Sequence, residues 1–214
     1  MTDPGTNGAG RGASSQTGSV TPVESELVTS ARETMRAALH PSIFSHTMRV
    51  LCVARHLSAA RRTAPDHEAL AVAVLFHDSG TADENNGEQR FEVEGADAAA
   101  RFLDYWGWPA ERTQRVWEAI ALHTSPGIAE RFGSLAQLVR SAVLVDLGRT
   151  EMPIASTPAL GADLARYPSL DIDRILPHLV VAQALGQGQD VKAPPFSWPG
   201  ALVAEHLAGQ ASTP

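Results

Sequence analysis

The sequence predicts an all-α, single-domain protein, and three observations support this prediction. Alanine, leucine, valine and arginine are abundant, whereas clusters of β-branched and aromatic residues are sparse, so helix is favoured over sheet. Apolar residues recur at offsets of three, four and seven, the spacing that places them on one face of a helix. With 214 residues, 43% of them hydrophobic and 19% charged, the chain is globular in composition and long enough to bury one sizeable core.

The first two helices are predicted from their boundary residues. Thr21 begins a capping box that Glu24 completes, so a helix is expected over 21–39. The pair His40-Pro41 separates it from a second helix, which is expected over 42–60 because a serine cap is followed by helically spaced apolar residues.

A third helix is expected over 66–77, with Asp66 as its N-cap and a long apolar run after it. The next residues, 79–90, are polar and rich in turn-forming types, so they are predicted to form a loop. A fourth helix, 93–106, should stop at Gly107.

Three further helices are predicted in the second half of the chain. They run from Pro109 to the turn at 125–127, over 134–147 and over 171–185. Gly148 stops the second of them, while Asp171 caps the third, in which Pro177 is expected to cause a kink. The segment 193–200 is rich in proline and is predicted to be irregular.

The chain is expected to comprise a leader and one domain. Residues 1–20 are rich in glycine, serine and threonine and lack the apolar stretch of a signal peptide, so they are predicted to be disordered, ahead of a helical domain over 21–210. Cys52 is the sole cysteine, which excludes an intrachain disulfide and fits a reducing, cytoplasmic location.

The expected partner is a small-molecule substrate. A net charge of −7, with Lys192 as the only lysine, argues against a nucleic-acid-binding surface. No apolar run is long enough to cross a membrane. Phe102, Trp106 and Trp108 would suit either the core or an exposed patch for homo-oligomer formation.

Four polar residues lie where the pattern predicts buried helix faces. The pair His77-Asp78 closes the apolar run 69–76, while His46 and Asp146 each share a stripe with apolar residues of their own helices. An ionised carboxylate that points into a core is costly unless a positive charge accompanies it. A bound divalent metal reconciles all four residues, and nitrogen and oxygen donors suit zinc, iron or manganese.

Each of these residues, taken singly, has a simpler interpretation as a satisfied buried polar group. His46 would then be bonded to a carbonyl group and Asp146 to an arginine. His123 also faces inward, and it suits a further ligand, a ligand of a second metal, a hydrogen-bond donor to substrate, or a core histidine. The acidic residues within 92–97 are either a solvated helix start or groups beside the site.

The order of His46, His77-Asp78 and Asp146 on an all-α chain resembles the HD-domain metalloenzyme superfamily. The resemblance covers about residues 39–148. Three segments also look like the cyanamide hydratase-type branch: His-Pro-Ser-Ile-Phe-Ser-His at 40–46, Arg-Phe-Glu-Val-Glu-Gly-Ala-Asp at 90–97, and 117–129, which begins Trp-Glu-Ala-Ile-Ala-Leu-His.

This resemblance implies that His46, His77, Asp78 and Asp146 bind one divalent metal ion, Zn²⁺ or Fe²⁺, and that His123 lies in the same pocket. It implies a hydro-lyase that converts cyanamide to urea. Water activated by the metal, as hydroxide, would attack the carbon of the C≡N bond. Asp78 would orient that water and carry its proton, and His123 would protonate or hydrogen-bond the substrate nitrogen, so both are expected to be catalytic.

Three rival functions remain open. Metal-dependent phosphohydrolysis of a nucleotide or another phosphoester needs cationic partners, for which Arg49, Arg55 and Arg90 are available, although Asp83-Glu84 disfavours anions. A mixed-valent di-iron oxygenase needs additional ligands, and only His123 is an obvious candidate. The third rival is a non-enzymatic role, in which the site is structural or senses a ligand.

Overall fold

The computed structural model describes residues 24–61, 66–152, 157–187 and 189–211. Across these residues the chain forms ten α-helices and three short 3₁₀ helices, with no β-strand. The α-helices are α1 (Glu26–Ala38), α2 (Pro41–Arg61), α3 (His67–Phe76), α4 (Phe91–Tyr105), α5 (Ala110–Ala121), α6 (Gly133–Asp146), α7 (Pro158–Ala165), α8 (Ile172–Gln187), α9 (Gln189–Lys192) and α10 (Trp198–Ala211). The 3₁₀ helices are η1 (Ser79–Thr81), η2 (Asp83–Asn85) and η3 (Ala129–Arg131). The predicted all-α fold class is confirmed.

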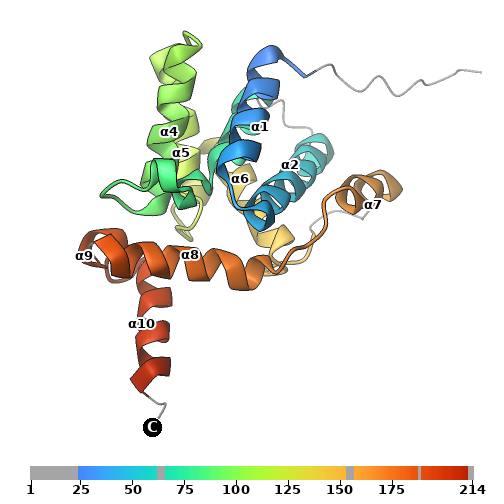
Figure 1. The fold of residues 1–214 in the computed structure, drawn as a ribbon. Coiled ribbons are helices and arrows are strands. Elements are labelled where there is room, and N and C mark those ends of the chain that lie inside the picture. Colours follow the sequence, from blue (N-terminus) through green and yellow to red (C-terminus); the bar gives the residue numbers. More distant parts are fainter. Residues whose placement is uncertain (1–23, 62–65, 153–156, 188, 212–214) are drawn as a thin grey trace, which may run out of the picture.

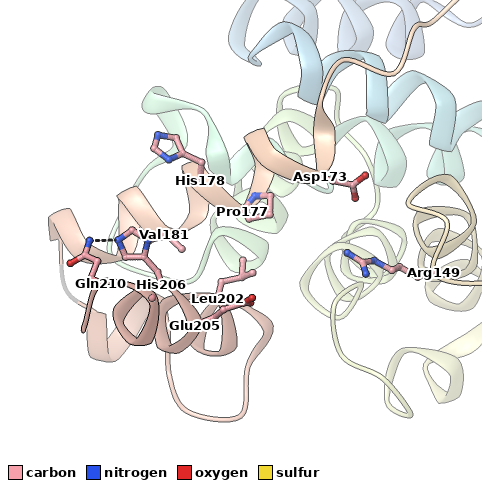
Figure 2. Close-up of a pocket in the computed structure, with 10 residues that line it drawn as sticks. Arg149, Asp173, Pro177, His178, Val181, Leu202, Glu205, His206 and Gln210 are labelled. Carbon is pink, nitrogen blue, oxygen red and sulfur yellow. Dashed lines mark hydrogen bonds between the residues drawn. The ribbon is translucent and has the colours of Figure 1, made fainter. Parts of the chain in front are cut away.

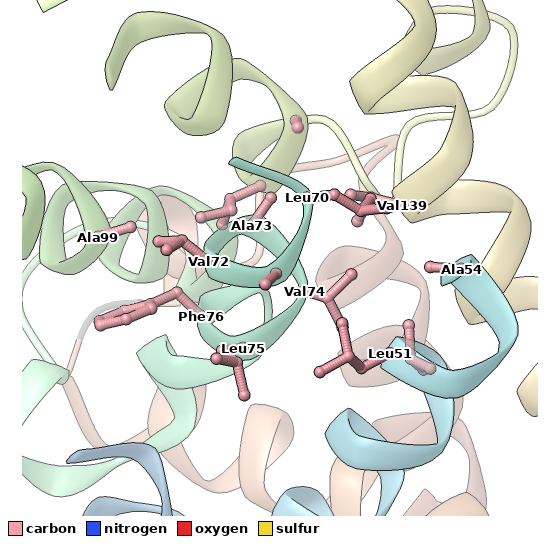
Figure 3. Close-up of a cluster of buried hydrophobic side chains, with 14 of the residues drawn as sticks. Leu51, Ala54, Leu70, Val72, Ala73, Val74, Leu75, Phe76, Ala99 and Val139 are labelled. Carbon is pink, nitrogen blue, oxygen red and sulfur yellow. The ribbon is translucent and has the colours of Figure 1, made fainter. Parts of the chain in front are cut away.

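Helix α3 lies at the centre of the bundle. Every residue from Ala69 to Phe76 is buried, and α1, α2, α4, α5 and α6 all pack around it. Figure 3 shows its side chains among Leu51 of α2, Ala99 of α4 and Val139 of α6. A helix that is apolar on all sides needs such an environment. Its C-terminal end, where the polar pair His77-Asp78 follows, is therefore held firmly in the interior.

The other helices form a bundle with one projecting end. In Figure 1, α8 runs across one end of the bundle, and α10 extends from α8 away from it. Helix α7 packs beside α2, and α10 packs on α8. Within the described residues, none of the helices is both long and apolar enough to span a bilayer. Phe102, Trp106 and Trp108 are only partly exposed and pack against the core.

Several predicted boundaries differ from the structure. Thr21, the predicted first cap, lies outside the described residues, as does the predicted leader. Ser25 caps α1 by accepting a hydrogen bond from the backbone N–H of Val28 at 3.4 Å. Asp66 caps α3 as predicted, by accepting from the backbone N–H of Ala69 at 3.1 Å. Helix α4 begins two residues before the predicted start, at Phe91.

Helices α7, α9 and α10 were missed by the sequence analysis. Proline caused two of these errors, because it is tolerated in the first turn of a helix as well as in loops. Thr157 caps α7 by accepting from the backbone N–H of Leu160 at 3.1 Å, and Pro158 occupies its first turn. Helix α10 starts at Trp198, inside the segment 193–200 that was predicted to be irregular. The predicted loop 79–90 contains the two tight turns η1 and η2.

Candidate metal centre

Three predicted ligands meet in the interior of the bundle. His46 comes from the second turn of α2, while His77 and Asp78 follow the last residue of α3. Each offers one ligand atom, and these atoms lie within 4.8 Å of one another. The three residues are each at most 1% exposed. These donors, two imidazole nitrogens and a carboxylate oxygen, are of the type that binds divalent transition metals.

Neighbouring residues on a regular helix point about 100° apart, so His77 and Asp78 can face one point only if the helix ends between them. His77 keeps helical dihedral angles, but Asp78 has φ −105° and ψ 8°, which depart from the helix. The chain then turns tightly beneath α4. A Cβ atom at Gly80 would lie 2.0 Å from the carbonyl oxygen of Phe91, so only glycine fits there.

We therefore expect Gly80→Ala to lower the free energy of unfolding by about 3 kcal/mol, because backbone must move to admit the methyl group. Gly161→Ala is the matched control, since a Cβ atom there meets nothing within 4 Å and alanine is the better helix former. Urea unfolding of both variants measures the difference. Equal stabilities would show that the turn tolerates a side chain.

The Nε2 atoms of three histidines converge on the carboxylate of Asp78. Nε2 of His77 lies 3.1 Å from Oδ2 of Asp78, and Nε2 of His46 lies 3.7 Å from the same oxygen. Nε2 of His123, which follows α5, lies 3.6 Å from Oδ1 of Asp78. The two Nε2 atoms of His46 and His77 are 3.4 Å apart. His123 thus shares the pocket of the three predicted ligands.

The opposite ring nitrogen of each histidine is already occupied. Nδ1 of His77 donates to the carbonyl oxygen of Val74 at 2.7 Å, and Nδ1 of His123 donates to that of Ile120 at 2.7 Å. Because a carbonyl oxygen can only accept, Nδ1 carries the proton and Nε2 is left with a lone pair in the neutral ring. Hydrogen bonding of this kind at the remote nitrogen is typical of metal-binding histidines.

Asp146 lies behind His46. Its Oδ2 is 2.8 Å from Nδ1 of His46, and its Oδ1 accepts from Nε of Arg49 at 2.7 Å. The Asp146 side chain is 1% exposed. In this arrangement the carboxylate fixes the orientation of the His46 ring. The contact with Arg49 is the one expected if Asp146 is a satisfied buried polar group. Direct ligation by Asp146 stays a prediction.

The charges of the pocket fit a divalent cation. Burial by itself lowers the pKa of His77. The charge of Asp78 and its hydrogen bond, together with the hydrogen bond to Val74 and the charge of Asp146, outweigh burial and raise that pKa overall. Burial opposes ionisation of Asp78, yet His77 and the other two histidines hold the pKa of Asp78 well below its ordinary value. Oδ2 of Asp78 is buried and accepts no well-formed hydrogen bond. A metal ion would neutralise this oxygen, which otherwise needs an imidazolium beside it.

Metal affinity should therefore fall as the pH is lowered. The metal must displace a proton from His77, whose pKa is raised above its ordinary value of 6.5, so the decline should begin above pH 6.5. Asp78 stays ionised throughout this range because its pKa is depressed. Calorimetric titration with Zn²⁺ at about pH 8 and about pH 6, with measurement of released protons, checks this. An affinity that is equal at the two pH values contradicts it.

Residues 43–158 match the sequence profile of the HD domain, and this match covers more than half of the chain. The chain belongs to the HD-domain family. The matched residues include the HD pair at His77-Asp78, together with His46 and Asp146. None of the curated proteins matches the chain in sequence. The family implies metal-dependent chemistry of the hydrolase type, and the match ends before α8.

Glu92 is one of the acidic residues that were expected either at a solvated helix start or beside the site, and the structure buries it. Glu92, in the first turn of α4, is 0% exposed and accepts from Nη2 of Arg90 at 2.8 Å. It also accepts from the hydroxyl group of Thr124 at 2.5 Å, and Thr124 directly follows His123. Glu94 and Asp97, the other acidic residues of the predicted 92–97 cluster, accept hydrogen bonds from other partners. The interpretation as a solvated helix start is therefore wrong for Glu92, whose carboxylate is buried and hydrogen-bonded.

A cavity of about 670 Å³ lies between α8 and α10, apart from the HD pair. Figure 2 shows that Pro177, Val181 and Leu202 line it together with the charged Arg149 and Glu205. None of its lining residues belongs to the candidate metal centre. The charged groups of this cavity carry both signs and lie on the surface, so we do not assign the chemistry of the HD domain to it.

Proposed function

We propose that this HD-domain protein is a hydro-lyase that adds water to a small, neutral, nitrile-like molecule and converts cyanamide to urea. The metal would be one Zn²⁺ or Fe²⁺ ion held by His46, His77, Asp78 and Asp146. The coarser function, metal-dependent chemistry at an HD site, follows from the family and from the cluster of donors. The choice of a neutral substrate rests on the charges around that cluster.

Each of the three arginines that were considered for a phosphate group is already paired with a carboxylate. The pairs are Arg49 with Asp146 at 2.7 Å, Arg90 with Glu92 at 2.8 Å, and Arg55 with Glu24 at 2.8 Å. Arginine side chains bind a phosphate group through charge-assisted hydrogen bonds, which these three already make with carboxylates. These pairings are the observation that favours a neutral substrate over a nucleotide.

The chain's own residues can move the protons that hydration needs. A divalent metal at these donors would supply a water molecule of lowered pKa. In the addition, the oxygen of water bonds to the nitrile carbon, and the nitrogen gains two protons in succession to give urea. Asp78 would orient the water and accept its proton. His123, whose Nδ1 donates to Ile120, would take this proton on Nε2, which lies 3.6 Å from Oδ1 of Asp78, and give it to the substrate nitrogen.

Apolar side chains at the pocket suit a small substrate. The ring of Phe91 lies edge-on to that of His123, with centroids 5.7 Å apart, and it is 3% exposed. On its other side it meets Trp198 at 5.8 Å. Such rings exclude water from the reacting group and offer no charge to an anion.

The test is urea formation from cyanamide by purified protein loaded separately with Zn²⁺ and Fe²⁺. A panel of nucleoside monophosphates is assayed in parallel for phosphate release. Urea formation with no phosphate release supports the proposal and identifies the working metal. Phosphate release without urea replaces it with phosphohydrolysis, the other activity that suits an HD domain.

A further inference from the structure

The three C-terminal helices contact the segment that follows the HD pair, although they lie outside the matched residues 43–158. Nε2 of Gln183, in α8, donates to the carbonyl oxygen of Gly80 at 3.1 Å. Nζ of Lys192, the last residue of α9, donates to Oδ1 of Asn86 at 2.7 Å and lies 3.4 Å from the carbonyl oxygen of Gln89. The contacts thus run along residues 80–89, from η1 almost to the start of α4.

Lys192 is an unusual residue for a connecting role. It is the only lysine of the chain, and it is 4% exposed. Burial of an ammonium group is costly unless oxygen atoms receive its N–H groups, and Asn86 and Gln89 supply two of them. Burial lowers the pKa of Lys192, and the negative charge of Glu94 partly offsets this. Through these two contacts the buried ammonium group ties residues 86 and 89 to the end of α9.

Trp198, the first residue of α10, extends this support to the metal centre. Its ring meets Phe91 in an edge-on contact, and Phe91 meets His123 in the same way, with centroids 5.8 and 5.7 Å apart. The next residue of α4, Glu92, accepts a hydrogen bond from the hydroxyl group of Thr124. Two neighbouring residues of α4, Phe91 and Glu92, therefore contact the short turn that carries His123.

We propose that Lys192 and Trp198 are positioning residues of the metal centre. They hold residues 86–91 against the turn at His123, so that Nε2 of His123 stays directed at Asp78. The C-terminal helices are then a working part of the site rather than an appendage to the HD domain. The effect that we expect on turnover rests on the proposed function, so this inference deepens that function. The effect that we expect on the metal site does not depend on it.

The experiment compares the full-length variants Lys192→Met and Trp198→Ala with Lys192→Arg and Trp198→Phe, which keep the charge and the aromatic ring. Leu207→Ala is the matched control, because Leu207 lies on α10 and is 42% exposed, far along the helix from Trp198. All are loaded with Co²⁺, and the visible absorption bands of the bound ion report the geometry of its ligands. Kinetics with cyanamide are then measured, with kcat and KM separated.

We expect Lys192→Met and Trp198→Ala to bind Co²⁺ with altered absorption bands, because a displaced His123 no longer holds the carboxylate of Asp78. They should also lower kcat on the order of tenfold, with little change in KM. The two conservative variants should recover most of both properties, and the control should match the wild type. Spectra and kcat identical to those of the control would overturn the inference. If cyanamide is not turned over by the wild type, the proposed function fails, and the cobalt spectra alone decide this inference.

Discussion

Replacement of His77 by alanine should abolish both metal binding and urea formation. His77 contributes one of the clustered donor atoms and is fully buried. Even outer-shell partners of a metal typically contribute 10- to 100-fold in affinity, so loss of a ligand should weaken Zn²⁺ binding by more than about 100-fold. Calorimetry and urea formation measure the two losses.

Loss of folding would give the same result, so it must be excluded. Removal of one partner from a buried charged pair costs about 3–5 kcal/mol, because Asp78 would keep its charge without His77 beside it. His77→Gln preserves volume and polarity and should fold better. His206→Ala is the control, since His206 is exposed and bonds Gln210 on α10. Full metal affinity in a folded His77→Gln protein would refute the assignment of His77.

The core of the site was predictable because its residues break a pattern. His46 and the HD pair stand on helix faces that are otherwise apolar, and polar groups at such positions need a common reason. The same periodicity fixed the fold class, and the apolar run of α3 is buried throughout, as its composition indicates. Local spacing was sufficient for these features, since each depends on a single helix.

Features that depend on two distant segments could not be predicted in this way. Spacing placed Asp146 on an inner helix face, but only the packing of α6 on α2 directs it to Nδ1 of His46. The contact between Lys192 and Asn86 joins residues that are 106 positions apart. No local pattern marks either partner of such a contact. Trp198 was missed for the further reason that its helix begins in a proline-rich segment.

His123→Ala should separate metal binding from catalysis. Nε2 of His123 faces Asp78 at 3.6 Å, but His123 is not one of the three residues whose donor atoms cluster. Loss of a general acid costs typically 10²- to 10⁴-fold in rate, so kcat should fall by about 10²-fold or more while Zn²⁺ remains bound at one ion per chain. Metal content and steady-state kinetics measure the two properties on one preparation.

The metal content and turnover of the His123 variants also distinguish the roles that the sequence leaves open for His123. A lower metal content in His123→Ala, at unchanged stability, would make His123 a ligand, and a wild-type content of two ions per chain would indicate a dinuclear centre. His123→Asn retains a polar side chain but cannot donate a proton as imidazolium does, so it should be as slow as alanine if proton transfer matters. Recovery of turnover by asparagine would instead assign His123 to hydrogen bonding of the substrate. Full turnover in both variants would remove it from the mechanism.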